Sequence, residues 1–181
     1  MSRLHIPSVE TSPVASVPLL DAVKKQLGVV PNLMKLVGNS PAALEGYLSL
    51  NGALAKGSLG TKTGERIALA IAEINRCDYC LSAHTYLAAH VAKLDAAEIN
   101  ANRNGLSNDA KADSAVRFAA SVAQQRGHVS TDEVQKVKAA GYSDAEVVEI
   151  VLHVALNTLT NYINSVAETE IDFPVVQAFP K

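Results

Sequence analysis

Residues 61–84 read TKTGERIALAIAEINRCDYCLSAH and predict two helices joined by a short break. The first helix begins near Thr61 or Thr63. Its apolar side chains recur at the three- and four-residue spacing of one helix face: Ile67, Ala68, Ile71 and Ala72. The predicted break falls at residues 75–76, and the second helix runs from about Cys77 to Lys93. This stretch therefore predicts helix packed on helix, with no alternation typical of a strand.

Helix signals continue outward in both directions. Short helices are predicted at 17–28, closed by Gly28, and at 41–56, capped by Ser40. Capping-box spacing marks three further helix starts, at 95–98, 130–133 and 143–146, and the last helix runs from about 144 to 168. Residues 1–16 are rich in proline and small polar residues and predict an extended arm. We expect one all-α domain over 17–181, preceded by that arm.

Composition limits the classes of function. Hydrophobic residues make up 48% of the 181 residues, charged residues 19%, and the net charge is −2, which is typical of a folded protein. No cluster of lysine and arginine favours nucleic acid or an anionic membrane, and no run of eighteen apolar residues predicts a membrane span. The first residues lack the apolar stretch of a signal peptide, so we expect a cytoplasmic protein.

The two cysteines of the chain are three residues apart and are followed by a histidine. On a helix, Cys77, Cys80 and His84 fall on one face and can meet around a single point. Two thiols and a base suit a thiol that attacks, oxidises and is then resolved. The start of a helix favours Cys77 as the thiolate, whereas His84, one turn beyond Cys80, favours Cys80. The sequence leaves that choice open.

Other interpretations of these residues remain. The cysteines could be buried small hydrophobes, or ligands of a structural zinc, although the cluster offers three ligands where a closed site needs four. Covalent haem attachment requires a histidine directly after Cys80, and Leu81 stands there. Upstream, Glu65 and Glu73 are equally plausible acids by spacing, and Glu65 is also an ordinary first-turn carboxylate.

Glu65, the cysteine pair and His84 together resemble the Glu…Cys-x-x-Cys-x-x-x-His core of the AhpD-like alkylhydroperoxidases, in the carboxymuconolactone decarboxylase superfamily. The segments around this core, with 28–33, 40–44 and 161–174, are similar to the branch called peroxidase-related proteins. The likeness spans about residues 20–175. One departure is Tyr79, because AhpD has a relay histidine before the second cysteine, and a phenol with a pKa near 10 is no base at neutral pH.

The resemblance implies an all-α AhpD-like domain that assembles through helix packing into trimers or hexamers. It implies a peroxidase without haem, metal or other cofactor, in which Cys80 is the peroxidatic thiol and Cys77 the resolving thiol. His84 and Glu65 would form the proton relay, and Tyr79 would donate a hydrogen bond or pack. The partners so implied are a peroxide substrate and an external dithiol or thiol-protein reductant.

Two other functions remain open from the sequence: a protein disulfide reductase or redox sensor using the same pair, and a non-redox member of the fold that binds a small molecule. Further polar residues could line a pocket, although helix packing explains them equally well: Tyr47, Asn157, Asn161 and Tyr162. His153, set in an apolar run, is interpreted as a core or interface residue. The long final helix is a reasonable subunit contact.

Overall fold

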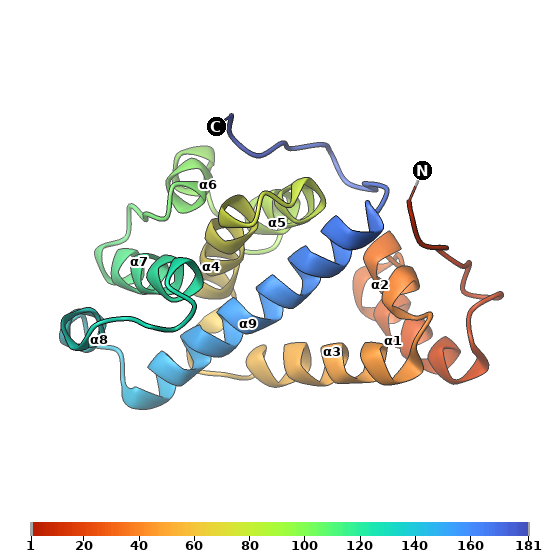
Figure 1. Ribbon diagram of the computed structural model, residues 1–181, viewed down its shortest axis with the longest axis horizontal. Helices are drawn as coiled ribbons and strands as arrows, with labels where there is room; N and C mark the ends of the chain where they lie inside the picture. Colours follow the sequence, from red (N-terminus) through yellow and green to blue (C-terminus); the bar gives the residue numbers. More distant parts are fainter. Residues whose placement is uncertain (1, 181) are drawn as a thin grey trace.

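A computed structural model describes residues 2–180, and its regular structure is entirely helical over that range (Figure 1). After the short 3-10 helix η1 (Val14–Ser16), the α-helices are α1 (Val17–Leu27), α2 (Asn32–Val37), α3 (Pro41–Leu54), α4 (Gly60–Ile74), α5 (Asp78–His90), α6 (Ala96–Arg103), α7 (Ala110–Gln124), α8 (Thr131–Ala139) and α9 (Asp144–Ala167). The all-α prediction is confirmed. The short helix α2, the 3-10 helix and α7 had not been predicted.

Helix ends follow local chemistry. Ser130 and Ser143 form reciprocal capping boxes at the starts of α8 and α9, as their spacing predicted. Asp95 caps α6 by accepting from the backbone of Glu98, but the Glu98 side chain turns away to pair with Arg66. Helix α9 ends at Ala167, and the left-handed backbone of Glu168 closes it.

Helix α4 is the centre of the packing and contacts α5, α6, α7 and α9. Its residues 67–72 are buried all round, so each face supplies a different hydrophobic cluster. Ile67 and Ile71 pack toward α7, α8 and α9, and Leu69 packs toward α5 and α6. Ala72 joins the cluster that holds both cysteines. A helix segment that is apolar on every face belongs in the core, and Glu65 lies two residues before this segment.

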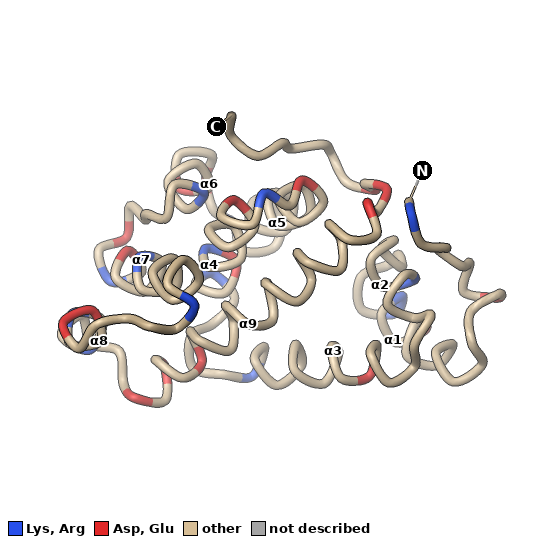
Figure 2. Tube along the Cα trace, in the orientation of Figure 1, with Lys and Arg blue, Asp and Glu red and all other residues tan. Residues whose placement is uncertain are grey.

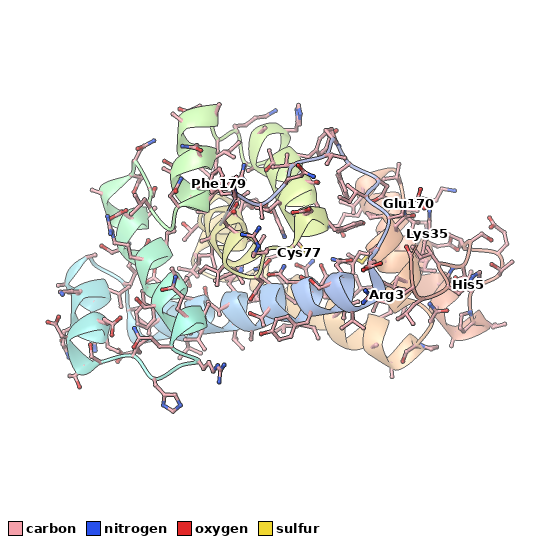
Figure 3. The ribbon with its side chains drawn as sticks, turned by 45° about the horizontal axis from the view of Figure 1, so that its top comes forward. Arg3, His5, Lys35, Cys77, Glu170 and Phe179 are labelled. Carbon is pink, nitrogen blue, oxygen red and sulfur yellow. A yellow bond between two sulfur atoms is a disulfide. The ribbon has the colours of Figure 1, made fainter. Side chains whose placement is uncertain are left out.

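The C-terminal segment crosses the start of α5. The backbone N–H of Ala178 donates to Asp78 at 2.9 Å, and that of Val176 donates to the Ser82 hydroxyl at 2.9 Å. The N–H of Phe179 donates to Glu73 at 2.6 Å. Figure 3 shows this segment passing over the side of the molecule where Cys77 and Phe179 lie. The segment therefore covers the α4–α5 corner and helps to bury it.

Candidate active site

The corner between α4 and α5 is built by backbone chemistry. Arg76 takes a left-handed backbone conformation, with φ of 56°, and the N–H of Cys77 reaches back to the carbonyl of Ala72 at 3.0 Å. The chain then restarts as α5, with the Cys77 sulfur accepting from the N–H of Cys80 at 3.3 Å. The break predicted at residues 75–76 is confirmed, and it sets Cys77 at the N-cap position of α5.

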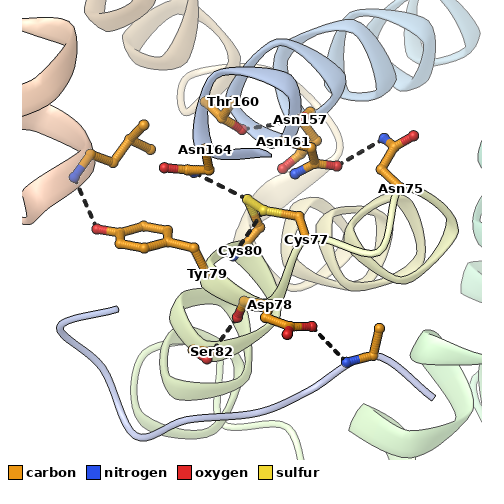
Figure 4. The surroundings of a disulfide bond; sticks show 12 residues. Asn75, Cys77, Asp78, Tyr79, Cys80, Ser82, Asn157, Thr160, Asn161 and Asn164 are labelled. Carbon is orange, nitrogen blue, oxygen red and sulfur yellow. Dashed lines mark hydrogen bonds between the residues drawn. A yellow bond between two sulfur atoms is a disulfide. The ribbon is translucent and has the colours of Figure 1, made fainter. Parts of the chain in front are cut away.

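Cys77 and Cys80 are joined as a disulfide, with their Cα atoms 5.2 Å apart. Each cysteine is only 3% exposed. The side-chain amide of Asn164, from α9, donates to the Cys80 sulfur at 3.3 Å (Figure 4). The two sulfurs therefore have different hydrogen-bond donors. The Cys77 sulfur accepts from a backbone N–H in the first turn of α5, and the Cys80 sulfur accepts from a side chain of α9.

Glu65 and His84 come from different helices and meet beside the cysteine pair. The Oε2 atom of Glu65, on α4, lies 2.9 Å from Nδ1 of His84, on α5. An ionised carboxylate only accepts, so Nδ1 carries a proton in this contact, and in the neutral imidazole Nε2 then keeps a free lone pair. The pair is partly buried, with side-chain exposures of 16% and 21%. A histidine oriented in this way is a suitable proton acceptor.

A cavity of about 160 Å³ lies between α3, α4, α5 and α9. Glu65, Cys80 and His84 all line it, whereas Cys77 does not. Its remaining wall is mixed, with apolar residues such as Leu54 and Leu156 beside aromatic and polar ones such as Tyr47 and Asn157. A small molecule in this cavity would meet one sulfur, Cys80, together with the histidine–carboxylate pair.

The other acid that spacing allowed, Glu73, lies elsewhere. Its Oε2 accepts from Nε of Arg103 at 2.8 Å, and its Oε1 accepts from the backbone of Phe179 at 2.6 Å. Arg103 also lies over the Phe179 ring, 3.9 Å from the ring centre. Glu73 therefore anchors the C-terminal segment, and of the two acids only Glu65 faces the cavity.

Tyr79 holds three parts of the fold together through its hydroxyl. That hydroxyl accepts from the N–H of Leu33 at 3.0 Å and donates to Asp172 at 2.8 Å, and the ring stands edge-on to Phe173. Burial raises the pKa of the Tyr79 phenol far above its usual value, and the Asp172 carboxylate raises it further. The ring lines the cavity, but the hydroxyl is engaged between α2 and the C-terminal segment.

Of the four polar residues that the sequence suggested as pocket-lining, two line the cavity and two do not. Tyr47 and Asn157 line the cavity, and burial, with the nearby Glu65 carboxylate, raises the pKa of Tyr47 to about 12. Asn161 instead pairs with the side chain of Asn75 at 2.9 Å. Tyr162 points away from the cavity and is 60% exposed.

His153, interpreted from the sequence as a core or interface residue, is half-buried and also lines the cavity. Burial lowers its pKa, although Glu149 and Glu65 oppose that shift. Its ring packs on Gly64, where an added Cβ would lie 3.1 Å from Cε1. The sequence did contain a signal for this cavity position: His153 is four residues before Asn157, and residues four apart share a helix face.

Two kinds of feature are absent from the described residues. Across residues 2–180, no three His, Cys, Asp or Glu side chains are grouped closely enough to hold a metal ion. In the same range, no helix has both the length and the apolar content needed to cross a membrane.

Comparison with known proteins gives a family match and several structural neighbours. Residues 41–123 match the model of the carboxymuconolactone decarboxylase family. No curated protein matches the sequence. A peroxidase-related protein from Ralstonia eutropha JMP134, described as an alkylhydroperoxidase AhpD core, is 19% identical, with a TM-score of 0.84 over 94% of this chain and 92% of that one.

Two further solved structures share the fold. A peroxidase-related protein from Silicibacter sp. TM1040 is 21% identical, with a TM-score of 0.81 over 93% of this chain and 91% of that one. The debrominase Bmp8 in its apo form is 19% identical, with a TM-score of 0.72 over 94% of this chain and 91% of that one. The same fold therefore occurs in proteins described by different chemistries.

Proposed function

We propose that this chain is a thiol peroxidase that reduces hydrogen peroxide or organic hydroperoxides, because residues 41–123 match the carboxymuconolactone decarboxylase family model and the fold is similar to that of an AhpD-core, peroxidase-related protein. The observation that supports the proposal is that Cys80 and the Glu65–His84 pair line the same cavity. Cys77, bonded to Cys80 but outside the cavity, would resolve the oxidised sulfur.

The first step is activation of the reduced Cys80. His84 Nε2 accepts the thiol proton, and Glu65 stabilises the imidazolium through Nδ1. The amide of Asn164 donates to the resulting thiolate. The thiolate is the form that attacks a peroxide, so these three side chains set the rate at neutral pH.

The thiolate then attacks one oxygen of R–O–O–H. A sulfur–oxygen bond forms, the O–O bond breaks, and Cys80 becomes a sulfenic acid while RO⁻ leaves. The imidazolium of His84 returns its proton to RO⁻, which departs as an alcohol or, for hydrogen peroxide, as water. The Cys77 thiol next attacks the sulfenic sulfur, forming the disulfide and releasing water.

Closing the cycle requires an external dithiol, which reduces Cys77–Cys80 by exchange and is itself oxidised to a disulfide. Both cysteine residues are only 3% exposed, so a bulky protein disulfide has no direct approach to them, and the external dithiol that reduces the pair is expected to be a small one. That burial favours a small peroxide as the oxidant over a protein substrate. For this reason we rank peroxidase above protein disulfide reductase.

The test uses pre-reduced protein and one equivalent of hydrogen peroxide or cumene hydroperoxide, followed by free-thiol titration and intact mass. The chain has two cysteines in all, so the loss of two thiols and of two hydrogens identifies one disulfide. Cys77→Ser should stop at a Cys80 sulfenic acid that dimedone traps, and Cys80→Ser should not react. Thiols that oxidise no faster than free cysteine would overturn the proposal.

A second substrate tests whether the protein is a debrominase instead of a peroxidase. Because a structural neighbour is a debrominase studied with 2,3,4-tribromopyrrole, the reduced protein is also incubated with that compound, and released bromide is measured. Thiol oxidation coupled to bromide release, without reaction with peroxide, would replace peroxidase with reductive debromination.

A further inference from the structure

The cavity has a second polar end, which the proposed reaction does not use. The residues of α9 that line it follow one face of the helix, from His153 to Asn164. Asn164 lies at the sulfur end, where its amide donates to Cys80, and His153 lies about three helical turns before it. Tyr47, on α3, and Asn157, on α9, line the cavity as well. What a ligand meets at the His153 end therefore decides which organic group the site accepts.

His153, Asn157 and Tyr47 have hydrogen-bonding capacity that the described part of the protein leaves unused. Asn157 donates through Nδ2 to the carbonyl of His153 at 2.8 Å, so its Oδ1 remains to accept. Within residues 2–180, no hydrogen bond is formed by the His153 ring or by the Tyr47 hydroxyl. Polar groups enclosed by protein are usually hydrogen-bonded. Three of them beside one cavity therefore fit a ligand that brings a polar group of its own.

The protonation states at this end indicate what that polar group is. Burial lowers the pKa of His153, so at neutral pH its ring is uncharged and has one donor and one acceptor nitrogen. Burial, with the Glu65 carboxylate nearby, raises the pKa of Tyr47 to about 12, so its hydroxyl keeps the proton and can donate or accept. Asn157 Oδ1 only accepts. A hydroxyl group, which both donates and accepts, is complementary to this mixture.

The charges around the cavity disfavour an anionic ligand. Among the described residues that line it, the only aspartate, glutamate, lysine or arginine is Glu65. Between Glu149 and Glu168, α9 has no charged side chain, and Figure 2 shows this stretch without blue or red. Glu149 itself is close enough to act on the pKa of His153, which adds a second negative charge near that end. A carboxylate would meet these charges and no cation, so the ligand that fits is neutral.

The cavity is large enough for one ring-sized group. Its volume is about 160 Å³, and a cavity of about 150 Å³ in another protein takes up benzene. The two polar ends lie within reach of such a group, because neighbouring residues of α4 hold them: the His153 ring packs on Gly64, and His84 pairs with Glu65. Between the ends, Leu156 supplies an apolar wall. A long alkyl chain exceeds this volume.

We propose that the organic substrate is an uncharged, ring-sized hydroperoxide with a hydroxyl group at the end remote from its O–O bond, and that His153 selects that hydroxyl. The inference rests on the proposed function, since it places the O–O bond of the ligand at Cys80. In this pose the peroxide group lies beside Cys80 and His84, the ring packs against Leu156, and the hydroxyl bonds to His153 and Asn157. The reacting end and the selecting end of the cavity are thus different residues.

The test measures the binding of three alcohols to the oxidised protein by NMR titration. An alcohol is the product that such a hydroperoxide leaves, and it cannot oxidise a thiol. The probes share a benzene ring with one hydroxymethyl group and differ at the para position: para-xylylene glycol has a second hydroxyl there, para-methylbenzyl alcohol a methyl group, and para-(hydroxymethyl)benzoate a carboxylate. We expect the glycol to bind about tenfold more tightly than the methyl compound, and the carboxylate to bind most weakly.

Variants of His153 test its role in the selection. His153→Leu should remove the advantage of the glycol, so that the glycol and the methyl compound bind about equally. His153→Gln, which keeps one donor and one acceptor, should retain most of the advantage. His128→Leu makes the same replacement at an exposed histidine and should bind all three probes as the wild type does. Circular dichroism checks that each variant is folded.

Equal binding of the glycol and the methyl compound to the wild type would overturn the proposal, as would tightest binding of the carboxylate or failure of all three probes to bind. An advantage of the glycol that survives in His153→Leu would overturn the role of His153. None of these results depends on whether the thiols react with peroxide. Thiols inert to peroxide in a protein that binds the glycol selectively would overturn the proposed reaction and leave this selectivity in place.

Discussion

Nδ1 of His84 lies 2.9 Å from Oε2 of Glu65, and both side chains line the cavity that holds Cys80. The two residues come from neighbouring helices, so the pair depends on the α4–α5 packing and not on sequence adjacency. Its effect is to fix one tautomer of the imidazole and leave Nε2 free to accept a proton. That arrangement is the basis of the first prediction.

Glu65→Gln should slow the reaction of Cys80 with peroxide by about a hundredfold, because an amide cannot stabilise the imidazolium that forms on activation. The measurement is the second-order rate of thiol loss in stopped-flow mixing with cumene hydroperoxide. Glu73→Gln is the matched control on the same helix, since Glu73 binds Arg103 and the C-terminal segment instead. Equal loss of rate in both variants would contradict the relay.

Asn164→Ala should raise the pKa of the reduced Cys80 thiol and slow its reaction by about tenfold, because the thiolate loses a hydrogen-bond donor. The pKa is measured from the ultraviolet absorbance of the thiolate in a Cys77→Ser background. Asn161→Ala is the matched control, since that amide pairs with Asn75 and not with sulfur. An unchanged pKa in Asn164→Ala would remove Asn164 from the mechanism.

Tyr79→Phe should lower the free energy of unfolding by about 1–3 kcal/mol, because the buried N–H of Leu33 and the Asp172 carboxylate would lose their shared partner. The rate of thiol oxidation should change little, since the phenol stays protonated and its hydroxyl is engaged away from sulfur. Urea unfolding and stopped-flow kinetics separate the two effects. A large drop in rate with stability unchanged would show that the hydroxyl acts in the reaction.

Much of this arrangement could be predicted from residues close in sequence. The helix break at 75–76 and the capping boxes at Ser130 and Ser143 depend on spacing within a few residues. The choice between Glu65 and Glu73 could not be predicted from local spacing, because it depends on which way α4 faces when it packs against α5 and the C-terminal segment. The resemblance to a family supplied that choice.

Contacts between distant segments escaped prediction for the same reason. Asn164 approaches Cys80 from 84 residues away, and no local pattern links the two. Helix α2 is six residues long, too short for a periodic apolar pattern. The cavity position of His153 required knowing which face of α9 meets α4, and that is a property of the packed fold.

His153 gives the last prediction, on the pH dependence of stability. Burial lowers its pKa in the folded protein, so the unfolded chain, with a pKa near 6.5, binds the proton more readily. Above about pH 7 the residue is neutral in both states and has no effect. As the pH falls below 6.5 the unfolded state takes up the proton first, and the free energy of unfolding decreases until the folded pKa is passed.

His153→Gln should remove that decrease, because glutamine does not titrate. We expect the wild type to lose more stability than the variant between about pH 7 and pH 5, as measured by urea unfolding at each pH. The exposed His128→Gln is the control, and its profile should follow the wild type. If His153→Gln and the wild type lost stability in parallel, His153 would not be held neutral by burial, and its place in the cavity wall would have to be reconsidered.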